Sequence, residues 1–203
     1  MLDAGGMGLY PPECIDLDRL ILRRPVPVDA ERMAASVSAS LEHLAPWMSW
    51  VTADAGTLER QRERLAAANA AWEAGEEYNF LALSRDSQNV LGRFGLHRQL
   101  GPGALELGYW LCPEAVGHGY ATAGAEALTA AALSLTDIQR VEIHCDEANL
   151  RSRRVPQRLG YRLDRVEVDG VQAPAEVGRS MIWVFPPTSR SSRTATAAAR
   201  SPS

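Results

Sequence analysis

Residues 104–122, with the sequence ALELGYWLCPEAVGHGYAT, join a strand-like run to a glycine pair and then to a helix-forming run. Gly117 and Gly119 carry no Cβ atom, so a ligand can approach the backbone closely at both positions. The N-terminus of the helix that follows offers unpaired N–H groups and a partial positive charge. This stretch therefore predicts a binding site for a phosphate group at the start of that helix.

Hydrophobic periodicity and turn residues on either side of this stretch predict a series of strands and helices. Strands are expected at 18–24, 78–84, 90–97, 104–111, 140–145, 161–168 and 180–185. Helices are expected at 30–44, 58–74, 120–135 and 150–159, and the first two have Asp29 and Thr57 as N-cap residues. The order of these elements is typical of an α+β protein with a mixed sheet, because the strands at 78–111 form an antiparallel meander.

The chain of 203 residues is expected to form one domain with two extensions. Residues 1–17 contain glycines and a Pro-Pro pair without periodicity, which predicts an N-terminal arm. Residues 18–185 contain every expected helix and strand. Residues 186–203 are rich in small polar residues, which predicts a disordered tail.

The composition argues against several classes of function. A net charge of −4 and an isoelectric point near 5.6 are untypical of a nucleic-acid-binding domain. The three cysteines are widely spaced without a CxxC pair, so no metal site is expected. No run approaches the roughly 18 apolar residues of a membrane span, and the N-terminus lacks the features of a signal peptide. We therefore expect no membrane partner and a cytoplasmic location.

Two common phosphate-binding loops fit the glycine pair poorly. A Walker loop needs a lysine after its glycines, and the chain contains no lysine. Gly124 and Asp137 stand where a Rossmann fingerprint has its third glycine and its acidic residue. However, a Rossmann loop follows its strand directly, whereas residues 112–116 intervene here. Another phosphorylated ligand is therefore needed to explain the loop.

The second half of the chain resembles an acyltransferase family. Residues 145–149 (CDEAN) and 152–161 (SRRVPQRLGY) resemble the second signature of the GNAT superfamily of acyl-CoA-dependent N-acyltransferases. Residues 106–111 (ELGYWL) and 117–122 (GHGYAT) resemble its first signature, in the version of the ribosomal-protein alanine acetyltransferase (RimJ/RimL) branch. Residues 44–50 (LAPWMSW) look like the tryptophan-bearing segment of that branch.

The resemblance implies a mixed, mostly antiparallel central sheet that is split between its fourth and fifth strands and flanked by helices. Acyl-CoA would lie in the split, with acetyl-CoA as co-substrate. The residues implied to contact it are Trp110, Leu111 and Cys112 along the pantetheine arm, Gly117, His118, Gly119, Tyr120, Ala121 and Thr122 at the pyrophosphate, and Asn149 and Ser152 on the opposite side.

The amine that attacks a thioester must lose a proton, and Glu106 is the first candidate for its base. Burial in an apolar strand would raise the pKa of such a carboxyl group toward neutrality. The alternative is a strand glutamate that faces solvent or pairs with an arginine. His97 is a second candidate for a base in the acceptor pocket, and a structural histidine is its alternative.

The chain departs from the family at the group that would protonate the leaving thiolate. Many members have a tyrosine seven residues after the asparagine that corresponds to Asn149, and Pro156 stands there in this chain. Ser152 is therefore expected either to relay a proton or to hydrogen-bond the cofactor or cap its helix. Trp47 and Trp50 are expected to line the acceptor pocket, with core packing as the alternative.

The resemblance implies transfer of an acetyl group from acetyl-CoA to a primary amine, and the branch suggests the α-amine of a peptide or protein N-terminus. Three alternatives remain open. The acceptor could be a small-molecule amine such as an antibiotic, a polyamine or an amino-acid derivative, the donor could be succinyl-CoA, or the protein could bind CoA without catalysis. Homodimers are common in the branch, so a homodimer is also compatible with the resemblance.

Overall fold

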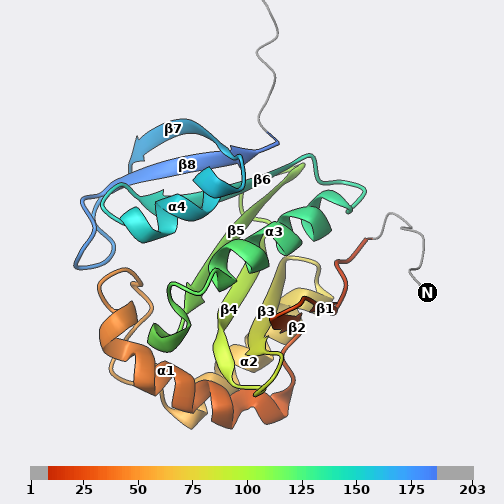
Figure 1. Cartoon of the computed structure of the whole chain (residues 1–203), viewed down its shortest axis with the longest axis vertical. Helices are drawn as coiled ribbons and strands as arrows, with labels where there is room; N and C mark the ends of the chain where they lie inside the picture. The colour runs from red at the N-terminus through yellow and green to blue at the C-terminus, as the bar shows by residue number, and fades with distance from the viewer. Residues whose placement is uncertain (1–8, 187–203) are drawn as a thin grey trace, which may run out of the picture.

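The computed structural model describes residues 9–186, which form one sheet with helices on both of its faces (Figure 1). The strands are β1 (Cys14–Asp16), β2 (Leu20–Arg23), β3 (Glu77–Ser84), β4 (Val90–His97), β5 (Ala104–Leu111), β6 (Arg140–Asp146), β7 (Arg162–Val168) and β8 (Arg179–Phe185). The α-helices are α1 (Ala30–Leu44), α2 (Leu58–Glu73), α3 (Tyr120–Leu133) and α4 (Leu150–Arg158). Short 3₁₀ helices span Pro27–Asp29 and Pro113–Ala115.

The eight strands of the described residues lie in the order β1-β2-β3-β4-β5-β6-β8-β7. Every neighbouring pair is antiparallel except β5 and β6, which are parallel. These two strands pair only from Ala104 with Arg140 to Glu106 with Glu142, although β5 continues to Leu111 and β6 to Asp146. Strands β5 and β6 therefore stop pairing just after Glu106 and divide the sheet in its middle.

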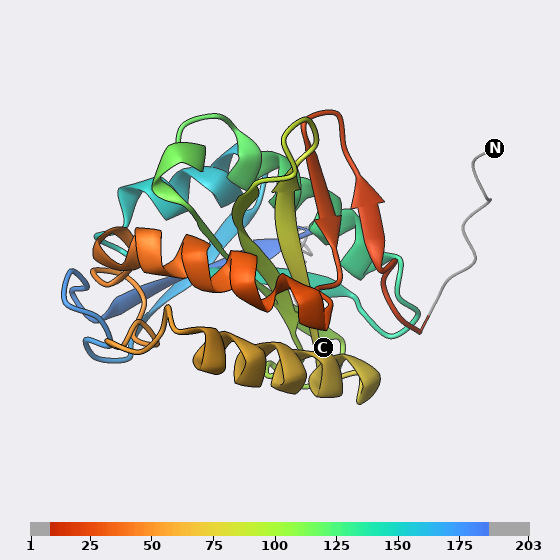
Figure 2. The ribbon, with the colours of Figure 1, turned by 90° about the horizontal axis from the view of Figure 1, so that it is seen from below.

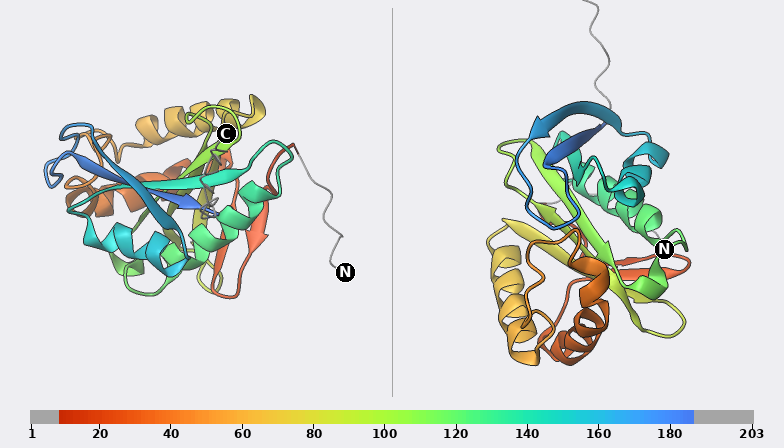
Figure 3. Two further views of the ribbon diagram at one scale, coloured as in Figure 1. Left: turned by 90° about the horizontal axis from the view of Figure 1, so that it is seen from above. Right: turned by 90° about the vertical axis from the view of Figure 1, so that its left-hand side faces the viewer.

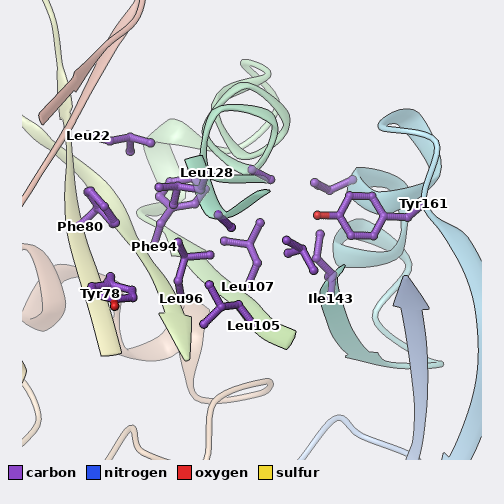
Figure 4. Packing of buried hydrophobic residues seen from close by; sticks show 14 of the residues in the cluster. Leu22, Tyr78, Phe80, Phe94, Leu96, Leu105, Leu107, Leu128, Ile143 and Tyr161 are labelled. Atoms are coloured by element: carbon purple, nitrogen blue, oxygen red, sulfur yellow. The ribbon is translucent and has the colours of Figure 1, made fainter. Parts of the chain in front are cut away.

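Helices α1 and α2 cover one face of the sheet, and α3 and α4 cover the other (Figures 2 and 3). The larger hydrophobic cluster includes side chains of β3, β4 and β5 that meet Leu128 of α3 (Figure 4). Gly124 lets α3 approach β4 closely, because a Cβ atom there would stand 2.4 Å from the Phe94 ring. A second cluster joins Met33 and Val37 of α1 to Trp110. Side chains therefore pack on both faces of β5.

The predicted α+β class is confirmed, and several predicted elements have the predicted bounds. The helix Ala30–Leu44 and the strands Val90–His97 and Ala104–Leu111 begin and end where the sequence indicated. Thr57 also caps α2, since its side chain accepts a hydrogen bond from the Arg60 N–H. The interior of the meander was therefore well encoded by local patterns.

Two features near the N-terminus differ from the expectations. Strand β1 lies inside the segment that was expected to be an arm, where Ile15 pairs with Leu22. Asp29 stands at the N-cap position of α1, but its side chain makes no cap hydrogen bond. Its carboxylate instead accepts two hydrogen bonds of 2.7 Å from Arg23 and one from the Val26 N–H. A tertiary ion pair has replaced the local cap.

The expected tail, residues 186–203, lies outside the described residues except for Pro186. Residues 1–8 of the expected arm lie outside them as well. Among the helices of the described part, none is long and apolar enough to cross a membrane.

Candidate active site

Four neighbouring strands each contribute one ionisable residue at the same register position. Glu77 of β3 pairs with His97 of β4, His97 pairs with Glu106 of β5, and Glu106 pairs with Glu142 of β6. Paired residues point their side chains to the same face of a sheet. The row therefore carries three carboxyl groups and an imidazole across the sheet, at the place where β5 and β6 separate.

A cavity of about 1110 Å³ includes Glu77, His97 and Glu106 of this row in its wall. It extends from α2 across β4 and β5 to β6 and α4. The predicted site residues that line it are Trp47, Trp50, His97, Glu106, Trp110, Asn149 and Ser152. The candidate base, the candidate acid and the expected acceptor walls thus share one cavity, whereas Leu111, Cys112 and residues 117–122 do not line it.

His97 is held by a carboxylate. Its Nδ1 donates a hydrogen bond of 2.6 Å to Glu77, and Glu77 also accepts one from the Asn79 side chain. The hydrogen bond from His97 is the main cause that lowers the pKa of Glu77 to about 2. The other ring nitrogen, Nε2, lies over Gly95, where a Cβ atom would stand only 2.6 Å away. The imidazole is therefore oriented by Glu77 with Nε2 as its second functional atom.

Glu106 is also in contact with polar neighbours. Its carboxylate accepts a hydrogen bond of 2.7 Å from the Gln99 side chain and lies 3.6 Å from Nδ1 of His144. Nε2 of His144 donates to Glu142 at 2.8 Å, and Glu142 also accepts from Arg140. Burial alone would raise the pKa of Glu142, but the hydrogen bonds from Arg140 and His144 outweigh it and lower that pKa.

The sequence reasoning missed His144 and Glu142, although both lie in the expected strand at 140–145. Strict alternation places the two side chains on one face of that strand. The signal that was lacking is the register, since the parallel pairing of Glu106 with Glu142 places Glu142 beside Glu106 and brings His144 into the cavity wall.

Ser152 lies beside a tyrosine that the sequence reasoning did not assign. The Tyr109 hydroxyl is 3.2 Å from Ser152 Oγ and 3.2 Å from the Ser152 carbonyl oxygen. Burial raises the pKa of Tyr109 well above its ordinary value, so the hydroxyl stays protonated at neutral pH. Pro156 explains the contact with the carbonyl, because it lacks the N–H that a helix would direct to Ser152.

Asn149 begins α4 and lies in the cavity wall. Its Oδ1 accepts a hydrogen bond of 3.0 Å from the Ser152 N–H, which is the geometry of an N-cap. Asn149 therefore fixes the first turn of α4 and, with it, the position of Ser152.

The glycine loop before α3 has an open backbone that is compatible with the predicted phosphate site. Gly117 and Gly119 have φ values of +87° and +83°, and a Cβ atom at either position would meet no atom within 4 Å. The first helical hydrogen bond runs from the Ala123 N–H to the Gly119 carbonyl, so the three preceding N–H groups stand at the open end of α3. Arg19 donates to the His118 carbonyl and lies 4.9 Å from the Tyr120 ring centre.

The backbone N–H just after β5 already has a hydrogen-bond partner, although the resemblance implied that this segment contacts the cofactor. The Cys112 N–H donates to the Leu91 carbonyl at 2.8 Å. The Cys112 thiol is buried, which raises its pKa.

Among residues 9–186, no group of three or more His, Cys, Asp or Glu side chains could hold a metal ion.

Trp50 both packs and lines the cavity. Its ring centre is 6.0 Å from that of Trp110, and the Arg64 guanidinium lies 4.5 Å from the Trp50 ring centre. Trp50 therefore packs in the core and also lines the cavity, and Trp47 lines the cavity as well. Their role in acceptor binding stays a prediction.

Comparison with known proteins agrees with this geometry. Residues 19–162 match the family described as Acetyltransferase (GNAT) domain. A Bacillus subtilis (strain 168) protein with the provisional name of ribosomal N-acetyltransferase YdaF is 28% identical over 163 residues, which cover 76% of this chain and 84% of that protein.

Two solved structures illustrate the likeness of the fold. The ribosomal-protein-S5-alanine acetyltransferase of Vibrio fischeri superposes with a TM-score of 0.77 at 16% identity, over 84% of this chain and 94% of that one. The microcin C7 self-immunity acetyltransferase MccE, solved with acetyl-CoA and AMP, has a TM-score of 0.78 at 17% identity, over 87% and 97% of the two chains. The family match covers residues 19–162, and it is consistent with the divided sheet and the glycine loop. The chain therefore belongs to the GNAT family of N-acetyltransferases.

Proposed function

We propose that the protein transfers an acetyl group from acetyl-CoA to the α-amine of a peptide or protein N-terminus. The observation that carries this proposal is the cavity in which Glu106, His97 and Ser152 meet where β5 and β6 separate. The names of YdaF and of the S5-alanine acetyltransferase favour a ribosomal protein as acceptor, which the protein would meet in the cytoplasm.

The donor site fits the residues that are present. The open N-terminus of α3 and the uncrowded Gly117 and Gly119 would hold the pyrophosphate, since anions bind at helix N-termini. Trp110 and Ser152, from the two sides of the divided sheet, would flank the pantetheine arm. Acetyl-CoA supplies the acyl group as a thioester, which is already activated toward an amine.

Glu106 would accept the proton of the acceptor amine, directly or through water. His144 lies 3.6 Å from Glu106 and is itself held by Glu142, so it can stabilise the Glu106 carboxylate or take the proton onward. His97 offers a second base, because its Nε2 remains available while Nδ1 is held by Glu77. Glu77 with His97 and Glu142 with His144 form two carboxylate–imidazole pairs, which lie on opposite sides of Glu106 in the sheet.

Ser152 and Tyr109 would return a proton to the leaving sulfur. Their hydroxyl groups are 3.2 Å apart, so the proton that Ser152 donates can be replaced from Tyr109. This pair takes the place of the tyrosine that Pro156 replaces.

A coupled assay of thiol release from acetyl-CoA tests the proposal against a panel of free peptides, N-terminally blocked peptides and small amines. We expect release with free peptides alone. Turnover restricted to small amines would favour small-molecule acylation, and CoA binding without turnover would favour a non-catalytic module. Repeating the panel with succinyl-CoA tests the donor.

Glu106→Gln separates the two candidate bases in the same assay. A general base contributes typically 10²- to 10⁴-fold, so we expect kcat to fall about 100-fold or more while KM for acetyl-CoA stays within about twofold. Glu126→Gln, on the exposed face of α3, is the matched control. An unchanged kcat in Glu106→Gln together with a large loss in His97→Gln would assign the base to His97.

A further inference from the structure

Arg93 is a charged residue in the cavity wall without an ionic partner. It lies on β4, opposite Leu81 of β3 and Trp110 of β5, and so points to the face that α1 and α2 cover. Its Nε is buried and has no hydrogen-bond partner. Within residues 9–186, no hydrogen bond or ion pair of at most 4.0 Å involves its guanidinium. Burial lowers the pKa of Arg93 to about 10, so the group still carries its charge at neutral pH.

Arg64 brings a second positive charge to the same part of the cavity. It belongs to α2, stacks on Trp50 at 4.5 Å and donates a hydrogen bond to the Trp50 carbonyl. Burial is the main cause of the lowered pKa of Arg93, and the positive charge of Arg64 adds to it. Two guanidinium groups in one wall destabilise the free protein unless an anion joins them.

Most of the other charged groups that line the cavity have partners within the chain. Glu77, whose negative charge raises the pKa of Arg93, is also engaged by His97 and Asn79. Asp146 accepts four backbone hydrogen bonds, and Arg98 pairs with Asp137. The cavity wall carries more carboxyl than guanidinium groups, but Arg93 and Arg64 are the two lining arginines that make no ion pair with a described residue.

The two arginines belong to other elements than the α4 side of the cavity. Ser152 of α4 and Cys145 of β6 line the cavity beyond the point where β5 and β6 separate. Arg64 belongs to α2, and Arg93 lies on β4 in register with Trp110, the residue expected beside the pantetheine arm. A carboxylate that reaches the arginines belongs either to the acceptor or to the acyl chain of the donor, and the succinyl-CoA comparison below distinguishes the two.

We propose that Arg93, assisted by Arg64, binds a carboxylate of the acceptor, so that the preferred substrate is a peptide with an acidic residue at or close to its N-terminus. A guanidinium presents parallel N–H donors that match a carboxylate in a bidentate pair. This assignment rests on the proposed function for the amine, while the carboxylate site itself can be measured without turnover.

The test uses pairs of acetyl-acceptor peptides that differ only by Asp or Asn at position 1, 2 or 3. In the wild type, kcat/KM for the Asp peptide should exceed that for the Asn peptide by about 10- to 100-fold at one position or more, the range of a hydrogen-bonded charge pair. Arg93→Met should bring this ratio close to one and change the Asn peptide by less than about threefold. Arg60 lies one turn before Arg64 on α2 and pairs with Glu63. Arg60→Gln is the matched control and should keep the ratio of kcat/KM between the Asp and Asn peptides.

Calorimetry gives the second readout. With CoA present, the wild type should bind the Asp peptide at least about fivefold more tightly than the Asn peptide, and Arg93→Met should not distinguish them. The melting temperature of ligand-free Arg93→Met should equal or exceed that of the wild type, because an unpartnered buried charge has been removed. This readout decides the carboxylate site even when no acceptor turns over.

Three results would overturn the inference. Equal kcat/KM and equal affinity for the Asp and Asn peptides at every position would remove the carboxylate site. An Asp preference that survives in Arg93→Met would assign it to other residues. If Arg93→Met lowers turnover with succinyl-CoA but not with acetyl-CoA, and leaves the Asp preference intact, then the carboxylate belongs to the acyl chain and not to the acceptor.

Discussion

At the scale of single residues, Pro156 has two consequences that oppose each other. It removes the tyrosine hydroxyl that many family members place there, and it removes the N–H that would occupy the Ser152 carbonyl. The Tyr109 hydroxyl uses that carbonyl and reaches Ser152 Oγ from β5. Under the proposed function, Tyr109 would supply a proton donor at the divided sheet from a different element.

Tyr109→Phe tests this replacement. We expect kcat to fall about 10- to 100-fold with KM for acetyl-CoA nearly unchanged, because the variant loses a proton donor and no binding surface. Tyr161→Phe is the matched control, since the Tyr161 hydroxyl is also buried and bonded, to Thr129 at 2.6 Å, outside the cavity. The same kcat in Tyr109→Phe and Tyr161→Phe would contradict the role of Tyr109.

Glu77 gives a pH-dependent prediction. Its folded-state pKa of about 2 is lower than its ordinary value of 4.5, mainly because His97 donates a hydrogen bond to it. The resulting stabilisation is present above pH 4.5 and is lost as the pH falls toward 2. Because the Glu77 side chain is 39% exposed, solvent screening reduces the effect to about 1 kcal/mol.

Denaturant unfolding of wild type and Glu77→Gln measures the effect. The difference in the free energy of unfolding should be about 1 kcal/mol at pH 6 and should vanish near pH 2. A difference that grows as the pH falls would contradict the assignment.

Single residues also show what the sequence could and could not predict. The alternation in 104–111 placed Glu106 and Trp110 on one face, and the structure confirms that both line the cavity. His144 and Arg93 could not be assigned, because their roles depend on which residues of separate strands are paired. The pairing of Arg93 with Trp110 spans 16 intervening residues and that of Glu106 with Glu142 spans 35, so neither leaves a local pattern.

At the scale of elements, the unit β5–loop–α3 was the best predicted part of the chain. The strand Ala104–Leu111 and the start of α3 at Tyr120 follow from local signals, and both loop glycines have a positive φ that glycine adopts readily. The short strand β1 was not predicted, since three residues carry too little periodicity. It pairs with β2 as a local hairpin closed by the hydrogen bond from the Leu17 N–H to the Leu20 carbonyl.

Gly119→Ala tests the loop. A residue with a Cβ atom at φ +83° costs about 1 kcal/mol in stability, and the loop would hold its N–H groups less well for the donor. We expect KM for acetyl-CoA to rise about tenfold. Gly170→Ala has the same strain at φ +81° in the β7–β8 hairpin, again with no atom within 4 Å of its Cβ, and should lose stability without a change in KM. Equal KM values in both variants would remove the loop from the donor site.

At the scale of the whole molecule, the two halves of the sheet are joined through three paired positions between β5 and β6 and through the packing of α3 against both halves. A donor that binds in the divided region would contact both halves at once. The proposed function therefore predicts that CoA stabilises the whole fold and not the loop alone.

Thermal unfolding with CoA measures this coupling. At 100 times its dissociation constant, CoA should add about 2.7 kcal/mol to the free energy of unfolding, which corresponds to roughly 5–10 °C in the melting temperature of a domain of this size. Gly119→Ala should show a smaller shift at the same CoA concentration. The absence of any shift at saturating CoA would contradict a donor site in the divided sheet.

The central claim is that the acetyl group goes to an N-terminal α-amine. The most direct test incubates the protein with acetyl-CoA and a peptide that carries both a free N-terminus and an internal lysine, and then locates the acetyl group by fragmentation mass spectrometry. The account predicts acetylation of the α-amine and an unmodified lysine, with no product from the N-terminally blocked peptide. Acetylation of the lysine alone, or no acetylated peptide from a protein that binds CoA, would contradict it.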